Sequence, residues 1–110
     1  RKGDICFIDF GQAYLMEIGY QHFGLILAFK HHKAFVVPMT GKPIRKMKSH
    51  LFALGEISGL YKESCLFLND AKWINTARII DVKGHIDPKG EQFRQILKCV
   101  CECIGAFEKG

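Results

Sequence analysis

The sequence predicts an α+β fold that is mainly β, a small, strongly bent antiparallel sheet or barrel followed by a C-terminal helix. Three observations predict it. Short apolar runs follow one another without intervening helices, two of these runs alternate with the period of a β-strand, and helical spacing begins only after Asp87-Pro88. Strands in series with one terminal helix are typical of this class. With 110 residues, the chain is expected to form one domain, 1–110.

The first strand is expected at DICFIDF, residues 4–10, which is rich in Ile and Phe. Residues 11–22 have no clear periodicity and contain two glycines, so a long loop is expected there. GLILAFK, residues 24–30, and HKAFVVPMT, residues 32–40, indicate two strands joined by a turn around His31.

The second and third of these strands carry their bulky side chains on one face. Large residues alternate along both strands, at Leu25, Leu27 and Phe29 in one and at Phe35, Val37 and Met39 in the other. The opposite parity holds Thr40, and also His22 if the second strand extends back that far. A period of two residues therefore predicts that Thr40 lies on the lighter face, together with His22.

Further short strands are expected at residues 50–56 and 64–68, and residues 72–82 continue the sheet less regularly. Trp73, in the last of these segments, is interpreted as a core residue. Asp87-Pro88 has the composition of an N-cap with proline at the first helical position, so a helix is expected over 88–106. Its apolar residues recur with helical spacing and predict the face that packs on the sheet, formed by Phe93, Ile96, Leu97, Val100 and Ile104.

Charge points to the class of partner. Sixteen Lys and Arg stand against eleven Asp and Glu, which gives a net charge of +5 and a sequence pI near 9.0. This balance favours a polyanionic partner. Four of the sixteen basic residues fall between Lys42 and Lys48, directly after the strand that ends in Thr40. No apolar run approaches the roughly 20 residues that span a bilayer, so no membrane segment is expected.

The cysteines and histidines give little support for a metal site. Three of the five cysteines form Cys99-Val-Cys-Glu-Cys103. On a helix Cys99 and Cys103 share a face while Cys101 points elsewhere, so the three are poorly placed to hold one metal ion. They are interpreted as packing cysteines of a protein in a reducing cytoplasm. His31-His32 has no third ligand nearby in the sequence, so neither a metal nor another cofactor is expected.

The order of several motifs resembles the MazF/PemK toxins of bacterial toxin–antitoxin systems. KGDICFIDF is similar to the opening strand of that family, HFGLILAF to its second strand, and VVPMT to a strand that ends in I-T or I-T-S. CLFLNDAKWINTARIIDVKGHI resembles the family's later segment, in which a strand leads to a polar turn and then a helix. HKAFVVPMTGKP also resembles the P-L-T-S-P-K segment of the ToxN/AbiQ toxins. The resemblance spans most of the chain.

This resemblance implies a barrel of the MazF/CcdB type and a metal-independent endoribonuclease that cleaves single-stranded RNA. It also implies a homodimer and a cognate antitoxin, which is either a protein or an RNA. The family's strand-terminal threonine corresponds to Thr40, and the ToxN-type lysine falls at or beside Lys42. MazF-like enzymes carry an arginine at the start of the second strand, where this chain has His22 or, with a different offset, Tyr20. Gly41 stands in the place of the usual serine.

RNA cleavage without a metal uses the 2′-OH of the substrate as the nucleophile. The site must take the proton of that hydroxyl, stabilise the charge of the phosphorane and protonate the leaving 5′-oxygen, so that the products are a 2′,3′-cyclic phosphate and a 5′-hydroxyl. Histidine suits the proton transfers, a lysine suits the charge, and a threonine hydroxyl can orient a phosphate oxygen. We therefore expect His22, Thr40 and Lys42 to be catalytic, with Tyr20 as the alternative to His22. The residues expected to bind RNA around them are Arg45, Lys46, Lys48, His50 and Tyr14.

Two other functions stay open from the sequence. One is a catalytically degenerate or CcdB-like barrel that acts by binding a protein target, and the other is an RNA-binding barrel with no toxin role. Loss of the family arginine favours both of these. The presence of Thr40, Lys42 and a histidine favours the endoribonuclease.

Overall fold

The computed structural model describes the backbone of residues 1–11, 21–40, 51–55 and 64–109, and side chains as far as residue 103. These residues form a seven-stranded sheet and one long helix, α1 (Glu91–Lys109). The strands are β1 (Asp4–Asp9), β2 (Gln21–Lys30), β3 (Lys33–Thr40), β4 (Leu51–Gly55), β5 (Ser64–Phe67), β6 (Lys72–Asn75) and β7 (Ile79–His85). Two short 3-10 turns, η1 (Leu68–Asp70) and η2 (Thr76–Arg78), flank β6.

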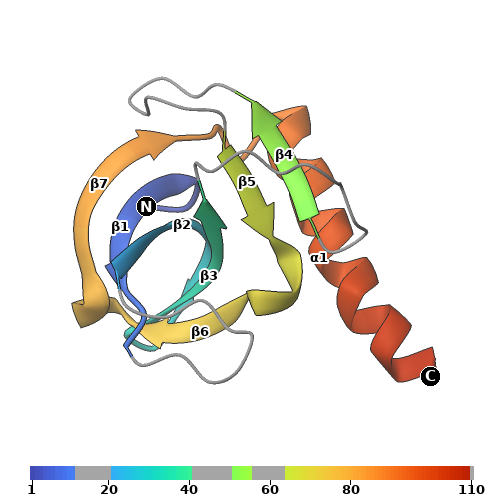
Figure 1. Ribbon diagram of the computed structural model, residues 1–110, viewed down its shortest axis with the longest axis horizontal. Coiled ribbons are helices and arrows are strands. Elements are labelled where there is room, and N and C mark those ends of the chain that lie inside the picture. The colour runs from blue at the N-terminus through green and yellow to red at the C-terminus, as the bar shows by residue number, and fades with distance from the viewer. Residues whose placement is uncertain (12–20, 41–50, 56–63, 110) are drawn as a thin grey trace.

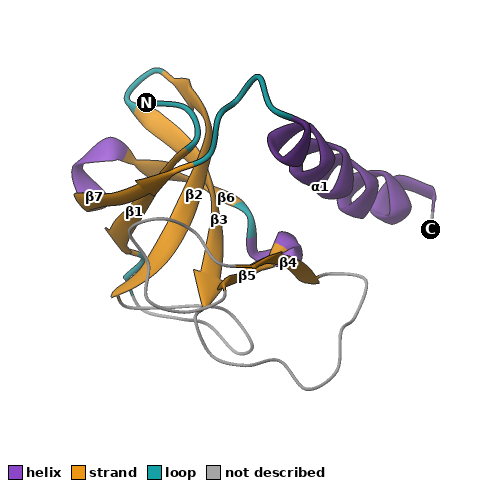
Figure 2. Cartoon of the chain, turned by 90° about the horizontal axis from the view of Figure 1, so that it is seen from above, coloured by secondary structure: helices purple, strands orange, loops and turns teal. Residues whose placement is uncertain are grey.

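The described strands are all paired antiparallel, in the order β4-β5-β3-β2-β1-β7, with β6 also paired to β3. Figure 1 shows the sheet curling so that β1, β2, β3, β6 and β7 surround a common centre, while α1 stands beside β4 and β5. Seen from above, α1 lies to one side of the curled sheet, near β4 and η1 (Figure 2). The predicted α+β class and the strongly bent antiparallel sheet are therefore confirmed.

The bent sheet has two buried faces because successive side chains of a strand point to opposite sides. One core lies between the sheet and α1, and its buried members include Leu25, Val37, Met39, Leu66, Phe93 and Ile96. The other core is enclosed by the curl of the sheet and contains Cys6, Ile8, Phe10, Ile26, Ala34, Val36 and Ile74. We call the face that carries the second core the inner face. Thr40 belongs to it, because it has the parity of Ala34 and Val36 along β3.

Strand β3 changes its partner half-way along. Its first half pairs with β6, up to the pair Val36–Lys72. Its last two residues pair with β5, through Met39–Leu66 and Thr40–Cys65. Pro38 lies between the two pairings, where a residue without a backbone N–H is tolerated. The turn η1 packs against β3 and connects the two partner strands at this point.

The helix differs from its predicted form in two respects. It begins at Glu91 rather than at Pro88, because the Asp87 carboxylate accepts a hydrogen bond from the Lys89 backbone and the Asp87 carbonyl one from Gly90, which makes a separate turn. Phe93, Ile96 and Val100 are buried as predicted, but Leu97 is 38% exposed. Cys99 and Cys103 pack against the helix core, Cys101 is exposed, and all five cysteines are free.

Other local predictions can also be compared with the structure. The turn between β2 and β3 lies at His31 and His32, which both have positive φ (48° and 63°), as a two-residue hairpin turn of this kind requires. Strand β2 begins at Gln21, so the loop predicted to reach residue 22 is shorter. A bulge between Ile26 and Ala28 shifts the register, and Phe29 is exposed rather than part of the bulky face.

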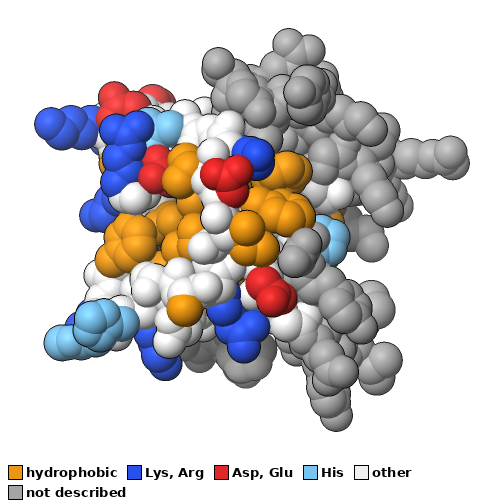
Figure 3. Space-filling view, turned by 90° about the vertical axis from the view of Figure 1, so that its left-hand side faces the viewer, with side chains coloured by type: hydrophobic (Ala, Val, Ile, Leu, Met, Phe, Trp, Pro, Cys, Tyr) orange, Lys and Arg blue, Asp and Glu red, His pale blue; other side chains and the backbone are white. Residues whose placement is uncertain are grey.

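The interpretation of Trp73 as a core residue is wrong. Its side chain is 46% exposed and contacts the ring of Phe35, with centroids 5.2 Å apart. Along β6 the inward positions belong to Lys72 and Ile74, which leaves Trp73 on the outside. Exposed apolar side chains are also found on β7, at Ile80 and Val82, and Figure 3 shows hydrophobic side chains gathered on the side of the molecule where β7 lies. Within the described residues, no helix is long and apolar enough to cross a membrane.

Candidate functional site

The structure brings together the two predicted catalytic residues that it describes. In the pairing of β2 with β3, Phe23 lies opposite Met39 and Gly24 opposite Pro38. The same register, continued by one residue, places His22 opposite Thr40. Directly opposed residues of neighbouring antiparallel strands share a face and have Cβ atoms about 4.5–5.5 Å apart. His22 and Thr40 are therefore cross-strand neighbours on the inner face.

This pair belongs to a row that crosses the sheet. His22 is paired on its other side with Ile8 of β1, and Thr40 with Cys65 of β5. Ile8 and Cys65 are buried, whereas His22 and Thr40 are both partly exposed. The row therefore presents an imidazole and a hydroxyl side by side between two apolar flanks, at the ends of their strands.

The thiol of Cys65, at the end of the row, is buried. Burial raises the pKa of the Cys65 thiol, and a hydrogen bond from the backbone of Phe52 offsets this only in part. The Cys65 thiol also lies 3.9 Å from the carbonyl oxygen of Leu66, to which it donates. A raised pKa makes a thiol a poorer nucleophile, which leaves His22 and Thr40 as the candidate reactive side chains of the row.

Below this row the inner face is filled by an aromatic ring. Gly24 follows His22 on the inner face, and a Cβ atom placed on it would lie 3.1 Å from Cζ of Phe10 and 2.9 Å from Cδ1 of Ile8. The ring of Phe10 therefore takes the space that a side chain at position 24 would need. The absence of a side chain at Gly24 allows Phe10 to close the floor of the site.

Two cations that the sequence analysis did not select lie near this floor. The ammonium of Lys72 is 5.4 Å from the centroid of the Phe10 ring. The guanidinium of Arg78 donates a hydrogen bond of 3.3 Å to the carbonyl oxygen of Asp9, at the end of β1. Lys72 shares the parity of the apolar Ile74 along β6, but the face to which both point depends on the pairing of β6 with β3. Arg78 carried no such pattern, because it belongs to the 3-10 turn η2.

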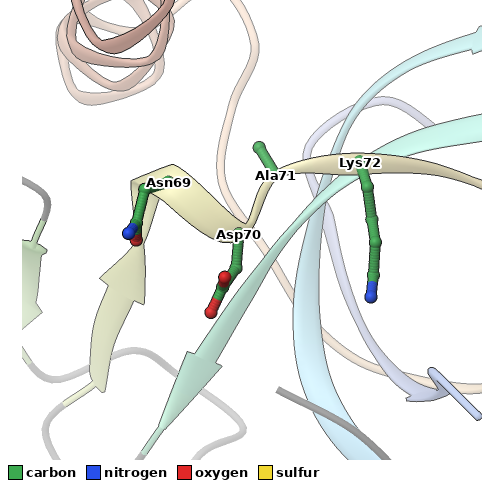
Figure 4. A pocket seen from close by; sticks show the side chains of 4 residues that line it. All are labelled: Asn69, Asp70, Ala71 and Lys72. Carbon is green, nitrogen blue, oxygen red and sulfur yellow. The ribbon is translucent and has the colours of Figure 1, made fainter. Parts of the chain in front are cut away.

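A cavity of about 270 Å³ lies beside Lys72, where η1 leads into β6, and Asn69, Asp70 and Ala71 also line it. Figure 4 shows the side chains of Asp70 and Lys72 on one side of the chain and that of Ala71 on the other. Ala71 packs against the helix core, in agreement with an inward direction for Lys72.

The other predicted site residues lie outside the part of the chain that the structure describes. They are Tyr14, Tyr20, Lys42, Arg45, Lys46, Lys48 and His50. Within the described residues, no three His, Cys, Asp or Glu side chains are grouped so as to hold a metal ion.

Comparison with solved structures finds the same fold in three mycobacterial proteins. An endoribonuclease from a mycobacterial species is 14% identical in sequence, with a TM-score of 0.68 over 94% of this chain and 89% of that one. An endoribonuclease in complex with its cognate antitoxin, also mycobacterial, is 15% identical, with a TM-score of 0.69 over 94% and 93%. The Mycobacterium tuberculosis toxin MazF-mt6 is 14% identical, with a TM-score of 0.61 over 94% and 93%.

No protein-family model matches the sequence, and no curated protein matches it either. At identities of 14–15%, the structural likeness establishes the fold. The chain therefore has the fold of these mycobacterial endoribonucleases, and the MazF type predicted from its motifs is confirmed at the level of the fold.

Proposed function

We propose that this protein is a MazF-like endoribonuclease toxin, formed by a single domain over residues 1–110, that cleaves single-stranded RNA without a metal ion. The observation that carries the proposal is the register of β2 and β3, which pairs Phe23 with Met39 and, continued by one residue, places His22 opposite Thr40 on the inner face. The shared fold also supports the proposal, since the solved structures with this fold include two named as endoribonucleases and one named as a MazF toxin.

In the proposed reaction the 2′-OH attacks the adjacent phosphate, and the products are a 2′,3′-cyclic phosphate and a 5′-hydroxyl. His22 takes the proton of the 2′-OH and delivers it to the leaving 5′-oxygen, because an imidazole changes its charge within the physiological pH range. Thr40 donates a hydrogen bond to a non-bridging phosphate oxygen and holds the phosphate in line for attack. Lys42, two residues further along the chain, stabilises the charge that develops on the phosphorane. Tyr20 is the alternative proton-transfer residue.

The partners follow from the same proposal. The basic segment that begins at Lys42 binds RNA phosphates on either side of the cleaved bond, with contributions from Arg45, Lys46, Lys48 and His50, and Tyr14 stacks on a base. A homodimer lines one groove for the RNA, and a cognate antitoxin, protein or RNA, blocks it in the bacterial cytoplasm. One of the similar structures contains an endoribonuclease with its antitoxin, which supports this type of partner.

The test is cleavage of an unstructured RNA of mixed sequence in the presence of EDTA. We expect cleavage, with 5′-hydroxyl and 2′,3′-cyclic phosphate ends identified by mass spectrometry. A 2′-deoxy nucleotide at the cleaved position should block the reaction. Thr40→Val should lower the rate with little loss of stability, because valine keeps the shape and the strand preference but removes the hydroxyl. His22→Ala should lower the rate by about 10²–10⁴, the usual contribution of general acid–base catalysis.

Other outcomes would change the assignment. If His22→Ala cuts as fast as the wild type while Tyr20→Phe does not, the proton transfer belongs to Tyr20. One observation favours a different class of function, namely that His22 or Tyr20 occupies the position of the arginine found in MazF-like enzymes. If the wild-type protein cuts no RNA in either EDTA or magnesium, the enzyme proposal fails, and a CcdB-like barrel that binds a protein or RNA target takes its place.

A further inference from the structure

Lys72 is a charged residue on an otherwise apolar part of the inner face. It lies opposite Val36 in the pairing of β3 with β6, and the next residue of the same parity, Ile74, is buried in the inner core. The lysine side chain is partly buried, and its ammonium lies over the ring of Phe10, 5.4 Å from the centroid.

The position of Phe10 relates this ammonium to the His22–Thr40 pair. Cζ of Phe10 lies 3.1 Å from the point where a Cβ on Gly24 would stand, and Gly24 is paired with Pro38. On the inner face, Gly24 is the next residue after His22 along β2, and Pro38 is the residue before Thr40 along β3. One such step is two residues, or about 6.7 Å along a strand. The ammonium therefore lies beside the site, displaced along the strands toward the middle of the sheet.

A ring under the ammonium favours a cation in this position. The face of an aromatic ring attracts a cation electrostatically, and the aliphatic stem of the lysine can lie along apolar surface while its head stays in reach of a ligand. An apolar residue would fill the same position without the cost of desolvating a charge. A lysine in this position therefore provides a positive charge on the inner face that an aliphatic residue would not provide.

We propose that Lys72 binds the RNA backbone at the phosphate adjacent to the scissile phosphate, and so fixes the position of the substrate on the inner face. The inference rests on the proposed function and adds a phosphate-binding residue to it. Lys72 supplies a positive charge from β6 on the same face as His22 and Thr40. This charge is relevant because the chain has no arginine at the start of its second strand. Lys72 is a residue that positions the substrate, and it takes no part in proton transfer.

The first experiment uses a short single-stranded RNA that spans a bond cut by the wild-type protein. Lys72→Met keeps the length and apolar character of the stem but removes the charge. It should raise KM about tenfold, a usual effect of losing one hydrogen bond to a charged group, and leave kcat near the wild-type value. The slope of log KM against log salt should become shallower by about 0.7, the value for one contact to a single strand. Lys72→Arg should restore most of the affinity.

The matched control is Lys98→Met, which removes an exposed lysine from α1 and should leave KM and the salt slope unchanged. A second experiment locates the contact without any change to the protein. Single methylphosphonates, which are uncharged, replace the phosphates of the RNA one at a time. Replacing a phosphate next to the cleaved bond should lower the affinity of the wild-type enzyme for the RNA. The same replacement should not lower the affinity of Lys72→Met any further.

The outcomes separate the two proposals. If the wild-type protein cuts RNA but Lys72→Met keeps its KM and salt slope, or if the methylphosphonate effects are equal in both proteins, the assignment of Lys72 is wrong and the proposed function stands. If Lys72→Met lowers kcat and leaves KM unchanged, Lys72 acts on the reacting phosphate instead of the adjacent one, which also contradicts the inference. If the wild-type protein neither binds nor cuts RNA, both proposals fall.

Discussion

Replacing Gly3 by alanine should destabilise the protein severely, because this residue joins three parts of the fold. Its N–H donates a hydrogen bond of 2.8 Å to the carbonyl oxygen of Ile26 in β2, and its own carbonyl oxygen accepts one of 2.8 Å from Ile86, which leads toward the helix. Its φ of +91° is one that residues with a side chain rarely adopt. A Cβ on this residue would stand 2.1 Å from the carbonyl oxygen of Ile86.

The magnitude follows from these contacts. Ordinary van der Waals contact begins at about 3.4 Å, so the backbone near Ile86 would have to move by more than an ångström and would lose its hydrogen bond to Gly3. The lost bond costs about 1 kcal/mol, the positive φ about 1–2 kcal/mol, and the crowding about 1–3 kcal/mol. The free energy of unfolding should therefore fall by roughly 4 kcal/mol, a large part of the 5–15 kcal/mol that is typical of a small domain.

The assay is urea unfolding followed by far-UV circular dichroism. With an m-value of about 1–3 kcal/mol per molar urea, the midpoint of Gly3→Ala should fall by more than about 1 M. Gly90→Ala is the control, because a Cβ there would lie 3.2 Å from the Asp87 carbonyl oxygen, a contact that a small shift relieves. If the urea midpoint of Gly3→Ala lies within about 0.3 M of the wild-type midpoint, the contacts of Gly3 with β2 and with the segment before the helix stabilise the fold less than inferred here.

Acid should weaken the fold through Asp4, whose buried carboxylate lies 2.8 Å from Nδ1 of His85. Burial raises the pKa of Asp4, but hydrogen bonds, among them those from His85 and the Arg1 side chain, outweigh it and hold the pKa below the ordinary 3.8. This stabilisation is therefore present above pH 3.8 and is lost as the pH falls below it. Asp4→Asn should lose about 1.5–3 kcal/mol near neutral pH and respond less to acid in urea titrations; an equally steep response would contradict this role. Sedimentation at micromolar concentration should show the proposed dimer, and a single species of 12.5 kDa would exclude it.

The positions of several strands along the chain, and the faces to which their side chains point, could be predicted from the sequence because they depend on local alternation. Val37 and Met39 face the helix core, and Val36 faces the inner core, as a period of two residues requires. The same alternation placed Thr40 correctly. It could not place Trp73, because the orientation of a four-residue strand depends on its pairing with β3, which is a tertiary contact.

The errors at the helix have similar causes. Asp87-Pro88 has the composition of a helix start, yet the Asp87 side chain caps a turn that ends at Gly90. Leu97 has the spacing of the buried face, but the sheet covers only the narrower stripe that includes Phe93, Ile96 and Val100. Spacing defines an apolar side of a helix, and the partner surface decides how much of that side is buried.

The positions of Lys72 and Arg78 explain why the site could be predicted only in part. His22 and Thr40 are neighbours through one strand pairing, which the parity of two adjacent strands anticipates. Lys72 reaches the same face from β6, through a second pairing with β3, and Arg78 reaches the end of β1 from the turn that follows β6. Both cations lie more than thirty residues after Thr40 in the chain. A family arginine at the start of β2 would place its charge beside Thr40 by local geometry alone. Here the charge near the pair comes from a distant segment. If the proposed function is correct, changes that loosen the pairing of β6 with β3 should weaken the proposed RNA binding even when His22 and Thr40 are intact.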